Sequence, residues 1–267
     1  MPWSWKQYQK LRLKKYREEW RLFAVEGTRL CREALASGWK IEAVFLNESF
    51  LQHLDSSEFE KILHRSNLKH EVLGDTNFRK LADTEHPQGV LFIVRMPETS
   101  LPPAPSVGKI NFVLILDGIR DPGNMGTILR SADWFGVEVI YASTDSVDFY
   151  NPKVIRASMG SFFHVPFIET DSLPQIIREL KKSDFHIIGT SLQSKRSMEN
   201  LSHRDPPFAL ILGGEAQGMS PALMALADSM VKIDKFGKAE SLNVAVAGGV
   251  LMNFLAQNFY KKMKKSK

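Results

Sequence analysis

Apolar runs alternate with amphipathic segments along most of the chain, most regularly in its second half. Near-continuous apolar runs predict strands at 111–116, 137–142, 185–190, 208–213 and 229–233. Helical spacing between them predicts helices at 125–135, 152–159, 172–182, 221–227 and 242–260. Strands that are apolar on both faces are typical of parallel sheets covered by helices. The pattern therefore predicts a doubly wound α/β domain over residues 110–267.

The first third of the chain alternates in the same way, with shorter elements. Its pattern predicts strands at 22–25, 44–46, 72–73 and 90–94, and helices at 28–36 and 55–65. These elements predict a second, smaller α/β domain over residues 1–96. The stretch at 97–109 is rich in proline and poor in apolar side chains, so it is predicted to be an extended linker.

Residues 4–20 predict a basic amphipathic helix, with Tyr8, Leu11 and Leu13 as candidate anchors. Seven cationic residues crowd this region: Lys6, Lys10, Arg12, Lys14, Lys15, Arg17 and Arg21. Cations beside aromatic rings suit RNA, but an ordinary solvated helix face has the same composition. The net charge of +5 and the pI near 9.2 agree with a nucleic-acid partner without identifying one.

The single cysteine, Cys31, excludes an intrachain disulfide and a cysteine-rich zinc site. It suits a reducing compartment, so a cytoplasmic location is expected. The N-terminus has no apolar core of the signal-peptide kind, and the longest apolar run near the C-terminus, Val244–Met252, is too short to span a bilayer. The sequence has no cluster of His, Cys and carboxylate residues at metal-ligand spacing, so no metal is expected.

The first stretch with candidate chemistry runs from Leu114 to Gly136. Its strand ends at Leu116 and breaks at Asp117-Gly118, and after a second turn Asn124 is the expected N-cap of the helix that follows. Gly126 and Arg130 are four residues apart and share a helix face. The competing interpretation is an ordinary helix in which Arg130 pairs with Asp133.

Two further loops follow strands of the same predicted sheet. Glycines surround Glu215 in the loop at 213–219, which a tight turn alone could also explain, and the spacing fits neither a Walker A nor a dinucleotide motif. After Ile233, Ser241 is the expected cap of the last helix, and Asn243 lies in its first turn. Small residues make that helix thin, which predicts burial on several sides or a partner subunit.

Together these stretches resemble the SpoU (TrmH-like) RNA ribose 2′-O-methyltransferases of the SPOUT superfamily. The motifs that carry the resemblance are Asn124-x-Gly126-x-x-x-Arg130, the segment 212–218, and Ile233 followed by residues 240–244. Phe23-x-Val25-Glu26-Gly27 and residues 87–90 resemble the family's substrate-binding domain, which is similar to ribosomal L30e. The sequence departs from the family pattern at Ala216, Asp234 and Ala245, which affects the expected shape of the cofactor loop.

The resemblance implies a Rossmann-like parallel sheet tied in a deep trefoil knot, although knots are very rare. It implies S-adenosylmethionine as cofactor, bound by Ser191, Gly213, Gly214, Gly218, Ile233 and Leu242. It also implies a homodimer whose active site is completed across the interface. By the same resemblance the catalytic group is Asn124, Arg130, Glu215, Ser241 and Asn243.

The implied reaction is methylation of an RNA ribose 2′-hydroxyl, with ribosomal RNA favoured over transfer RNA by analogy with two-domain relatives. Arg130 is expected to stay charged and to stabilise the developing alkoxide, because a guanidinium is rarely neutral. The alternative is a non-catalytic RNA-binding protein on the same scaffold. The basic N-terminal segment, the lysine-rich tail at 261–267 and the altered third motif favour it.

Overall fold

The structure of the chain is a computed structural model that describes residues 4–52, 59, 61, 63–64, 66–97, 110–201 and 207–265. The chain forms two compact units. The first comprises Met1–Thr99 and Asp148–Phe163, and the second comprises Ser100–Val147 and His164–Lys267. The predicted linker and most of the helix predicted at 55–65 lie outside the described residues. The boundaries 1–96 and 110–267 stay a prediction.

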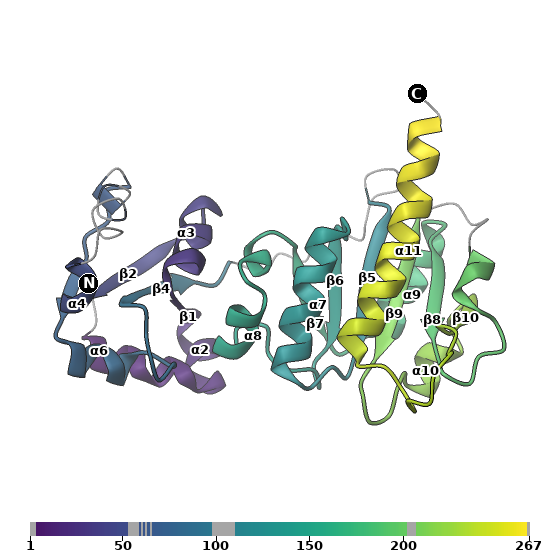
Figure 1. Cartoon of the computed structure of the whole chain (residues 1–267), viewed down its shortest axis with the longest axis horizontal. Coiled ribbons are helices and arrows are strands. Elements are labelled where there is room, and N and C mark those ends of the chain that lie inside the picture. The colour runs from purple at the N-terminus through teal and green to yellow at the C-terminus, as the bar shows by residue number, and fades with distance from the viewer. Residues whose placement is uncertain are drawn as a thin grey trace. The chain divides into compact units, whose positions relative to one another are not determined.

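The first unit is built on a four-stranded mixed sheet in the order β1-β4-β2-β3 (Figure 1). Its strands are β1 (Leu22–Glu26), β2 (Ile41–Asn47), β3 (Glu71–Leu73) and β4 (Val90–Arg95). Strand β4 is antiparallel to β1 and β2, and β3 runs parallel to β2. The helices are α3 (Thr28–Ala36), as predicted, and α4 (Glu48–Leu51) and α6 (Asp75–Leu81), which the sequence pattern did not predict.

The basic N-terminal segment is broken into three short helices and not the single helix predicted. They are α1 (Trp5–Tyr8), the 3-10 helix η1 (Gln9–Arg12) and α2 (Lys14–Trp20). Leu13 has extended backbone angles, which ends η1, and its side chain is 60% exposed, so its predicted anchoring role is wrong. Tyr8 and Leu11 are buried and join the core beneath the sheet, as predicted.

The segment Asp148–Phe163 lies between two strands of the second unit in sequence but packs within the first. It contains α8 (Pro152–Ala157) and the 3-10 helix η2 (Ser161–Phe163). The Arg17 guanidinium is buried and lies 2.5 Å from Asp148 Oδ2, while it also donates to two main-chain carbonyls. Arg17 is therefore a packing residue, and its assignment to the exposed basic face is wrong.

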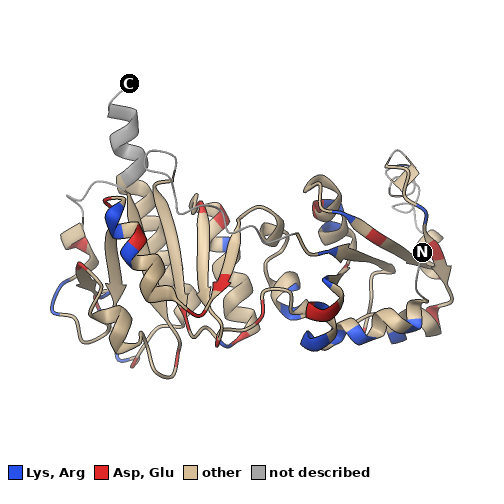
Figure 2. Ribbon diagram, turned by 180° about the vertical axis from the view of Figure 1, so that it is seen from behind, with Lys and Arg blue, Asp and Glu red and all other residues tan. Residues whose placement is uncertain are grey.

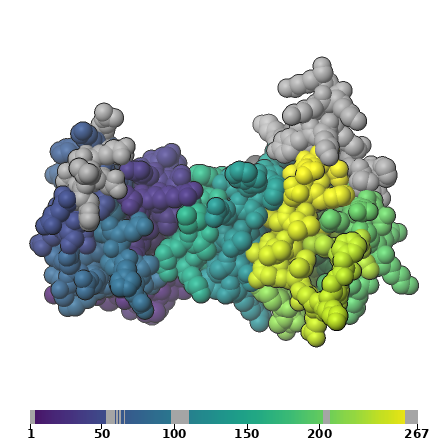
Figure 3. Space-filling view, in the orientation of Figure 1, coloured from purple at the N-terminus to yellow at the C-terminus, as the bar shows by residue number. Residues whose placement is uncertain are grey.

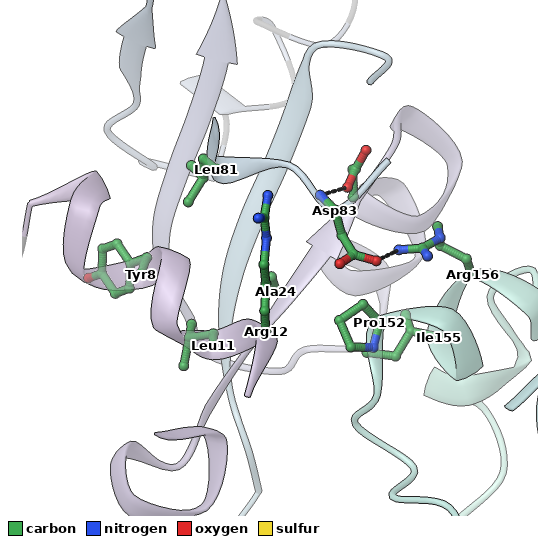
Figure 4. A pocket seen from close by; sticks show the side chains of 10 residues that line it. Tyr8, Leu11, Arg12, Ala24, Leu81, Asp83, Pro152, Ile155 and Arg156 are labelled. Carbon is green, nitrogen blue, oxygen red and sulfur yellow. Dashed lines mark hydrogen bonds and ion pairs between the residues drawn. The ribbon is translucent and has the colours of Figure 1, made fainter. Parts of the chain in front are cut away.

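A small cavity of about 20 Å³ in the first unit is lined by residues of α1, η1, β1 and α8 (Figure 4). Arg156 pairs with Asp83 across it at 2.8 Å, and Arg12 donates to the carbonyl of Lys80 at 2.9 Å. A volume of this size holds about one water molecule. The cavity is therefore part of the packing and has no room for an organic ligand.

The second unit contains a six-stranded, fully parallel sheet in the order β10-β8-β9-β5-β6-β7. Its strands are β5 (Phe112–Asp117), β6 (Val139–Ser143), β7 (Phe167–Thr170), β8 (His186–Thr190), β9 (Phe208–Gly213) and β10 (Ser229–Val231). Alternate residues of β5 and β9 pack on α9 (Leu173–Lys182) and α10 (Pro221–Met224). Both faces of the central strands are buried, which confirms the predicted α/β architecture.

The other face of this sheet carries α7 (Pro122–Trp134) and α11 (Val244–Lys265), which lie side by side (Figure 1). Gly248 of α11 approaches β9 closely, since a Cβ there would lie 2.7 Å from the Leu212 side chain. The thin final helix predicted from the sequence is thereby explained in part. The trefoil knot stays a prediction. Within the described part of the chain, no helix combines the length and apolarity needed to cross a membrane.

Candidate functional site

Three loops leave the second unit's sheet at one edge, because all its strands are parallel. They follow β5, β9 and β10 and lead into α7, α10 and α11, at the lower end of the sheet in Figure 1. The three predicted motifs occupy these three loops. The sequence therefore places the candidate chemistry at the edge where open α/β sheets bind their ligands.

Asn124 connects all three loops through its side-chain amide. The amide nitrogen donates to Glu215 Oε1 in the loop after β9. The amide oxygen accepts from Asn243 Nδ2 at 2.9 Å in the loop after β10. Three predicted site residues from distant parts of the sequence are thus joined in one hydrogen-bonded chain.

The caps of the two flanking helices differ from the predicted ones. Asp121 caps α7 and accepts from the backbone N–H of Asn124 at 2.8 Å, so the helix begins three residues earlier than predicted. Asn243, and not Ser241, caps α11, since its Oδ1 accepts from the N–H of Ala245 at 2.9 Å. Because Asn124 is not the cap, its side chain is available to the other two loops.

Glycines allow the loops after β5 and β9 to touch through their backbones. A Cβ on Gly214 would lie 2.2 Å from the carbonyl oxygen of Gly118. The N–H of Gly214 donates to the carbonyl of Asp117 at 2.8 Å. The Asp117 carboxylate accepts from the N–H of Ser220 at 2.7 Å, before α10. Asp117 was not predicted to position the loop, although an acid at a strand end and a serine before a helix were a usable signal.

The residues expected to bind S-adenosylmethionine surround the same loops. Ser191 follows β8 and donates its N–H to Val231 at 3.0 Å, which places it beside the end of β10. Gly218 has a φ of +66°, and a Cβ there would meet nothing within 4 Å. Leu242 exposes 48% of its surface next to Asn243. Gly218 and Leu242 are exposed beside these loops, and the assignment of these residues to the cofactor stays a prediction.

Arg130 and Ser241 are not joined to this hydrogen-bonded chain. Arg130 is exposed on α7, and among the described residues no hydrogen bond or ion pair engages it. The alternative pairing with Asp133 is wrong, because Asp133 pairs with His164 at 2.8 Å. Ser241 is exposed in the loop before α11. Their roles, like those of the other site residues, stay predictions.

The loop that precedes Asn124 is held by the end of β6. Ser143 Oγ accepts from the N–H of Gly118 at 2.9 Å and donates to Asp145 at 2.6 Å. Asp145 also accepts from Arg120 at 3.1 Å. The hydrogen bond from Ser143, supported by Arg120, lowers the pKa of the Asp145 carboxyl below its ordinary value. This carboxylate therefore stays charged at neutral pH and orders the loop.

Comparison with known proteins gives the family. Residues 111–253 match the model of the SpoU rRNA Methylase family, and residues 4–91 match the MRM3-like substrate binding domain. The chain is 32% identical over 250 residues to the 23S rRNA (guanosine(2553)-2′-O)-methyltransferase RlmP of Bacillus subtilis, covering 94% of each chain.

Two solved structures containing AdoMet match along nearly the full length. One is an rRNA methyltransferase from Sinorhizobium meliloti, at 27% identity and a TM-score of 0.82, covering 95% of this chain and 94% of that one. The other is the SpoU methyltransferase AviRb from Streptomyces viridochromogenes, at 26% identity and a TM-score of 0.83, covering 95% and 96%. With the motif residues gathered at one sheet edge, this chain belongs to the SpoU rRNA methylase family.

Proposed function

We propose that this protein transfers a methyl group from S-adenosylmethionine to a ribose 2′-hydroxyl of RNA, and that its substrate is ribosomal RNA. The observation that carries the proposal is the hydrogen-bonded chain Glu215–Asn124–Asn243, which unites three motif loops at the ligand-binding edge of the sheet. The match to an RNA 2′-O-methyltransferase over 94% of both chains supports the reaction class.

The cofactor supplies a methyl group on a positively charged sulfur. As the 2′-oxygen forms the new bond to the methyl carbon, the sulfur–carbon bond breaks and the sulfur keeps its electron pair. The protein must align that oxygen, let its proton pass to a basic group or to water, and stabilise its developing negative charge. Asn124 has a fixed orientation because Glu215 and Asn243 hold both ends of its amide. We assign it to positioning the ribose.

Arg130 is assigned to stabilising the 2′-oxygen as a permanent cation. Arg130 follows Asn124 by six positions, which is about 9 Å along the helix axis and about 240° around it. Within one chain it therefore points away from the loops. We propose a homodimer in which Arg130 of one subunit completes the site of the other.

The exposed surface of α7 and α11 supports such a dimer. Trp134 of α7 is 84% exposed and Val246 of α11 is 53% exposed, on two helices that pack against each other. Large apolar side chains exposed to solvent are characteristic of protein interfaces. A two-fold symmetric contact there would bury them against their own copies.

Complementation tests the shared site. Arg130→Ala is expected to abolish methyl transfer and Asn124→Ala to lower it about 100-fold, with the affinity of Arg130→Ala for S-adenosylmethionine within a few fold of wild type. If the two variants are mixed and subunits exchange, half of the dimers are mixed and one of their two sites is intact, so about a quarter of the wild-type activity returns. No recovery, in a mixture shown to exchange subunits, contradicts the composite site.

The N-terminal basic face is proposed to contact RNA phosphates. Lys10 lies 5.3 Å and Lys15 lies 6.0 Å from the ring of Tyr16, and Figure 2 shows Lys and Arg along these helices. Replacing Lys10 and Lys15 by Gln should raise the KM for RNA and make the affinity less dependent on salt. An unchanged salt dependence contradicts the assignment.

A non-catalytic RNA-binding protein is the second candidate function. The departures at Asp234 and Ala245 favour it, because they lie in the loop and helix that shape the cofactor site. Calorimetry with S-adenosylmethionine separates the two, since a scaffold without a cofactor site gives no saturable heat. Mapping 2′-O-methyl groups in RNA from cells that lack the protein then identifies the substrate and tests the ribosomal assignment.

A further inference from the structure

Two neighbouring loops at the β10 edge of the second unit form a basic surface with exposed apolar side chains. The first loop, 191–198, follows β8, and the second, 232–240, follows β10. Main-chain hydrogen bonds of 2.9 Å from Met198 to Lys232 and from Lys232 to Arg196 tie them together. Figure 3 shows the second loop as the yellow-green surface beside α11.

Phe236 is the most exposed large apolar side chain among the described residues, at 99%. It lies in a run from Asp234 to Asn243 in which every residue is exposed. Moving a phenylalanine side chain out of water lowers the free energy, so a loop that presents one to solvent is suited to binding a partner that covers it. Leu192 in the adjoining loop is 67% exposed and extends the same surface.

The charges around Phe236 favour an anionic partner. The two loops contribute five cations, Lys195, Arg196, Lys232, Lys235 and Lys238, against two acids, Asp234 and Glu240. In the described part of the chain, no hydrogen bond or ion pair engages the side chains of Lys235 and Lys238, on either side of Phe236. Figure 2 shows Lys and Arg on the loops at this edge.

We propose that Phe236 stacks on an unpaired nucleobase of the RNA substrate, while Lys235 and Lys238 contact its phosphates. An aromatic ring between cations is the arrangement that binds single-stranded RNA, because every base has a face to stack and a phosphate beside it. Phe236 precedes Asn243 by seven residues, which limits their separation to about 25 Å. The stacked base therefore lies within a few nucleotides of the target ribose.

This inference rests on the proposed function and adds a specificity-determining contact on the methyltransferase unit. Phe236 is a binding residue in it, since stacking holds the strand without touching the reacting atoms. The two other possible partners of Phe236, the cofactor and a second copy of the chain, are distinguished by the measurements below.

The test compares Phe236→Ala, Phe236→Trp and the control Met224→Ala, whose side chain is 37% exposed on α10. With 23S ribosomal RNA transcript as the probe, Phe236→Ala should raise the KM for RNA about tenfold, as loss of one stacked base does. Its kcat and its affinity for S-adenosylmethionine should stay within about twofold of wild type. Phe236→Trp and Met224→Ala should keep the wild-type KM.

Three results would overturn the proposal. An unchanged KM in Phe236→Ala means that no base stacks there. Weaker binding of S-adenosylmethionine means that Phe236 covers the cofactor, and loss of the dimer in sedimentation means that it packs on the other subunit.

Ultraviolet cross-linking of the wild-type protein to the same RNA provides a readout that does not require activity. The proposal expects a cross-linked peptide containing Phe236, and its absence counts against stacking even in an active enzyme. If the wild-type protein transfers no methyl group but cross-links at Phe236, the proposed function fails while the RNA contact stands.

Discussion

Asn124 is one side chain with two different hydrogen-bonding partners, and its amide supplies a donor for one and an acceptor for the other. Its nitrogen donates to the Glu215 carboxylate and its oxygen accepts from Asn243. Aspartate keeps the acceptor but loses the donor and places a second negative charge against Glu215. Alanine loses both. The identity of this residue is therefore tied to the geometry of all three loops.

Replacing Asn124 by Ala or Asp is expected to lower kcat about 100-fold, which is the cost of misplacing reacting groups by about 1 Å. The measurement is single-turnover methyl transfer at saturating RNA and cofactor. Thr127→Ala is the matched control on the same helix, because within the described residues the Thr127 hydroxyl bonds only to the carbonyl of Gly123. A wild-type rate in Asn124→Ala would remove this residue from the site.

Cys31 is the single cysteine of the chain and is fully buried in the first unit. Burial raises the pKa of its thiol well above the ordinary value, so the reactive thiolate is scarce at neutral pH. Alkylation of the native protein should be roughly 100-fold slower than in urea, or slower still, because the unit must open first. Mass spectrometry of timed samples measures this, and equal rates would contradict the burial.

At the scale of elements, Gly214 decides whether two loops can meet. A Cβ there would overlap the carbonyl oxygen of Gly118, a backbone atom that no rotamer change can move. Gly214→Ala should therefore abolish cofactor binding while the circular dichroism of the sheet and helices is unchanged. Gly237→Ala is the control, since a Cβ at that position meets nothing within 4 Å. Normal cofactor affinity in Gly214→Ala would contradict the role of the contact.

Long apolar strands were predictable from the sequence, because β5 and β9 are buried on both faces and read as uninterrupted apolar runs. Strand β7 was missed because only one of its four residues is buried, so it has no such run. The start of α7 was misplaced because Asp121 and Asn124 are both good caps, and Pro122 at the first helical position favours Asp121. A local sequence pattern alone does not decide between two such candidate caps.

The meeting of three motif residues was predictable from the sequence, whereas the hydrogen bonds between them were not. The motifs placed Asn124, Glu215 and Asn243 in loops and helix starts that follow three strands, and the parallel strands brought them to one edge. The hydrogen-bond partners depend on where the helices begin, and the observed starts differ from the predicted ones by up to three residues. Arg17 was mispredicted for the same reason. A cation among six others is predicted to be exposed unless its distant partner, Asp148, is known.

At the scale of the whole molecule, each unit has its own core, and the first is completed by a segment from the middle of the chain. Phe162 of that segment lies 5.5 Å from Phe23 of β1, and Arg17 and Asp148 are both at least nine-tenths buried. Removing one partner of a buried ion pair leaves an uncompensated charge. Unfolding of the first unit should therefore depend on Asp148–Phe163.

Arg17→Met is expected to destabilise the first unit by about 3 kcal/mol, because it leaves the Asp148 carboxylate buried without its cation. Alkylation of Cys31, which reports on this unit, should accelerate by about two orders of magnitude. Arg17→Met combined with Asp148→Leu should be less destabilised than Arg17→Met alone, since the unpaired charge is gone. Lys14→Met is the control, because Lys14 is exposed and its contact with Glu18 is 3.6 Å long. Binding of S-adenosylmethionine should stay unchanged in all three variants, and its loss in parallel with Cys31 exposure would mean that the two units unfold as one.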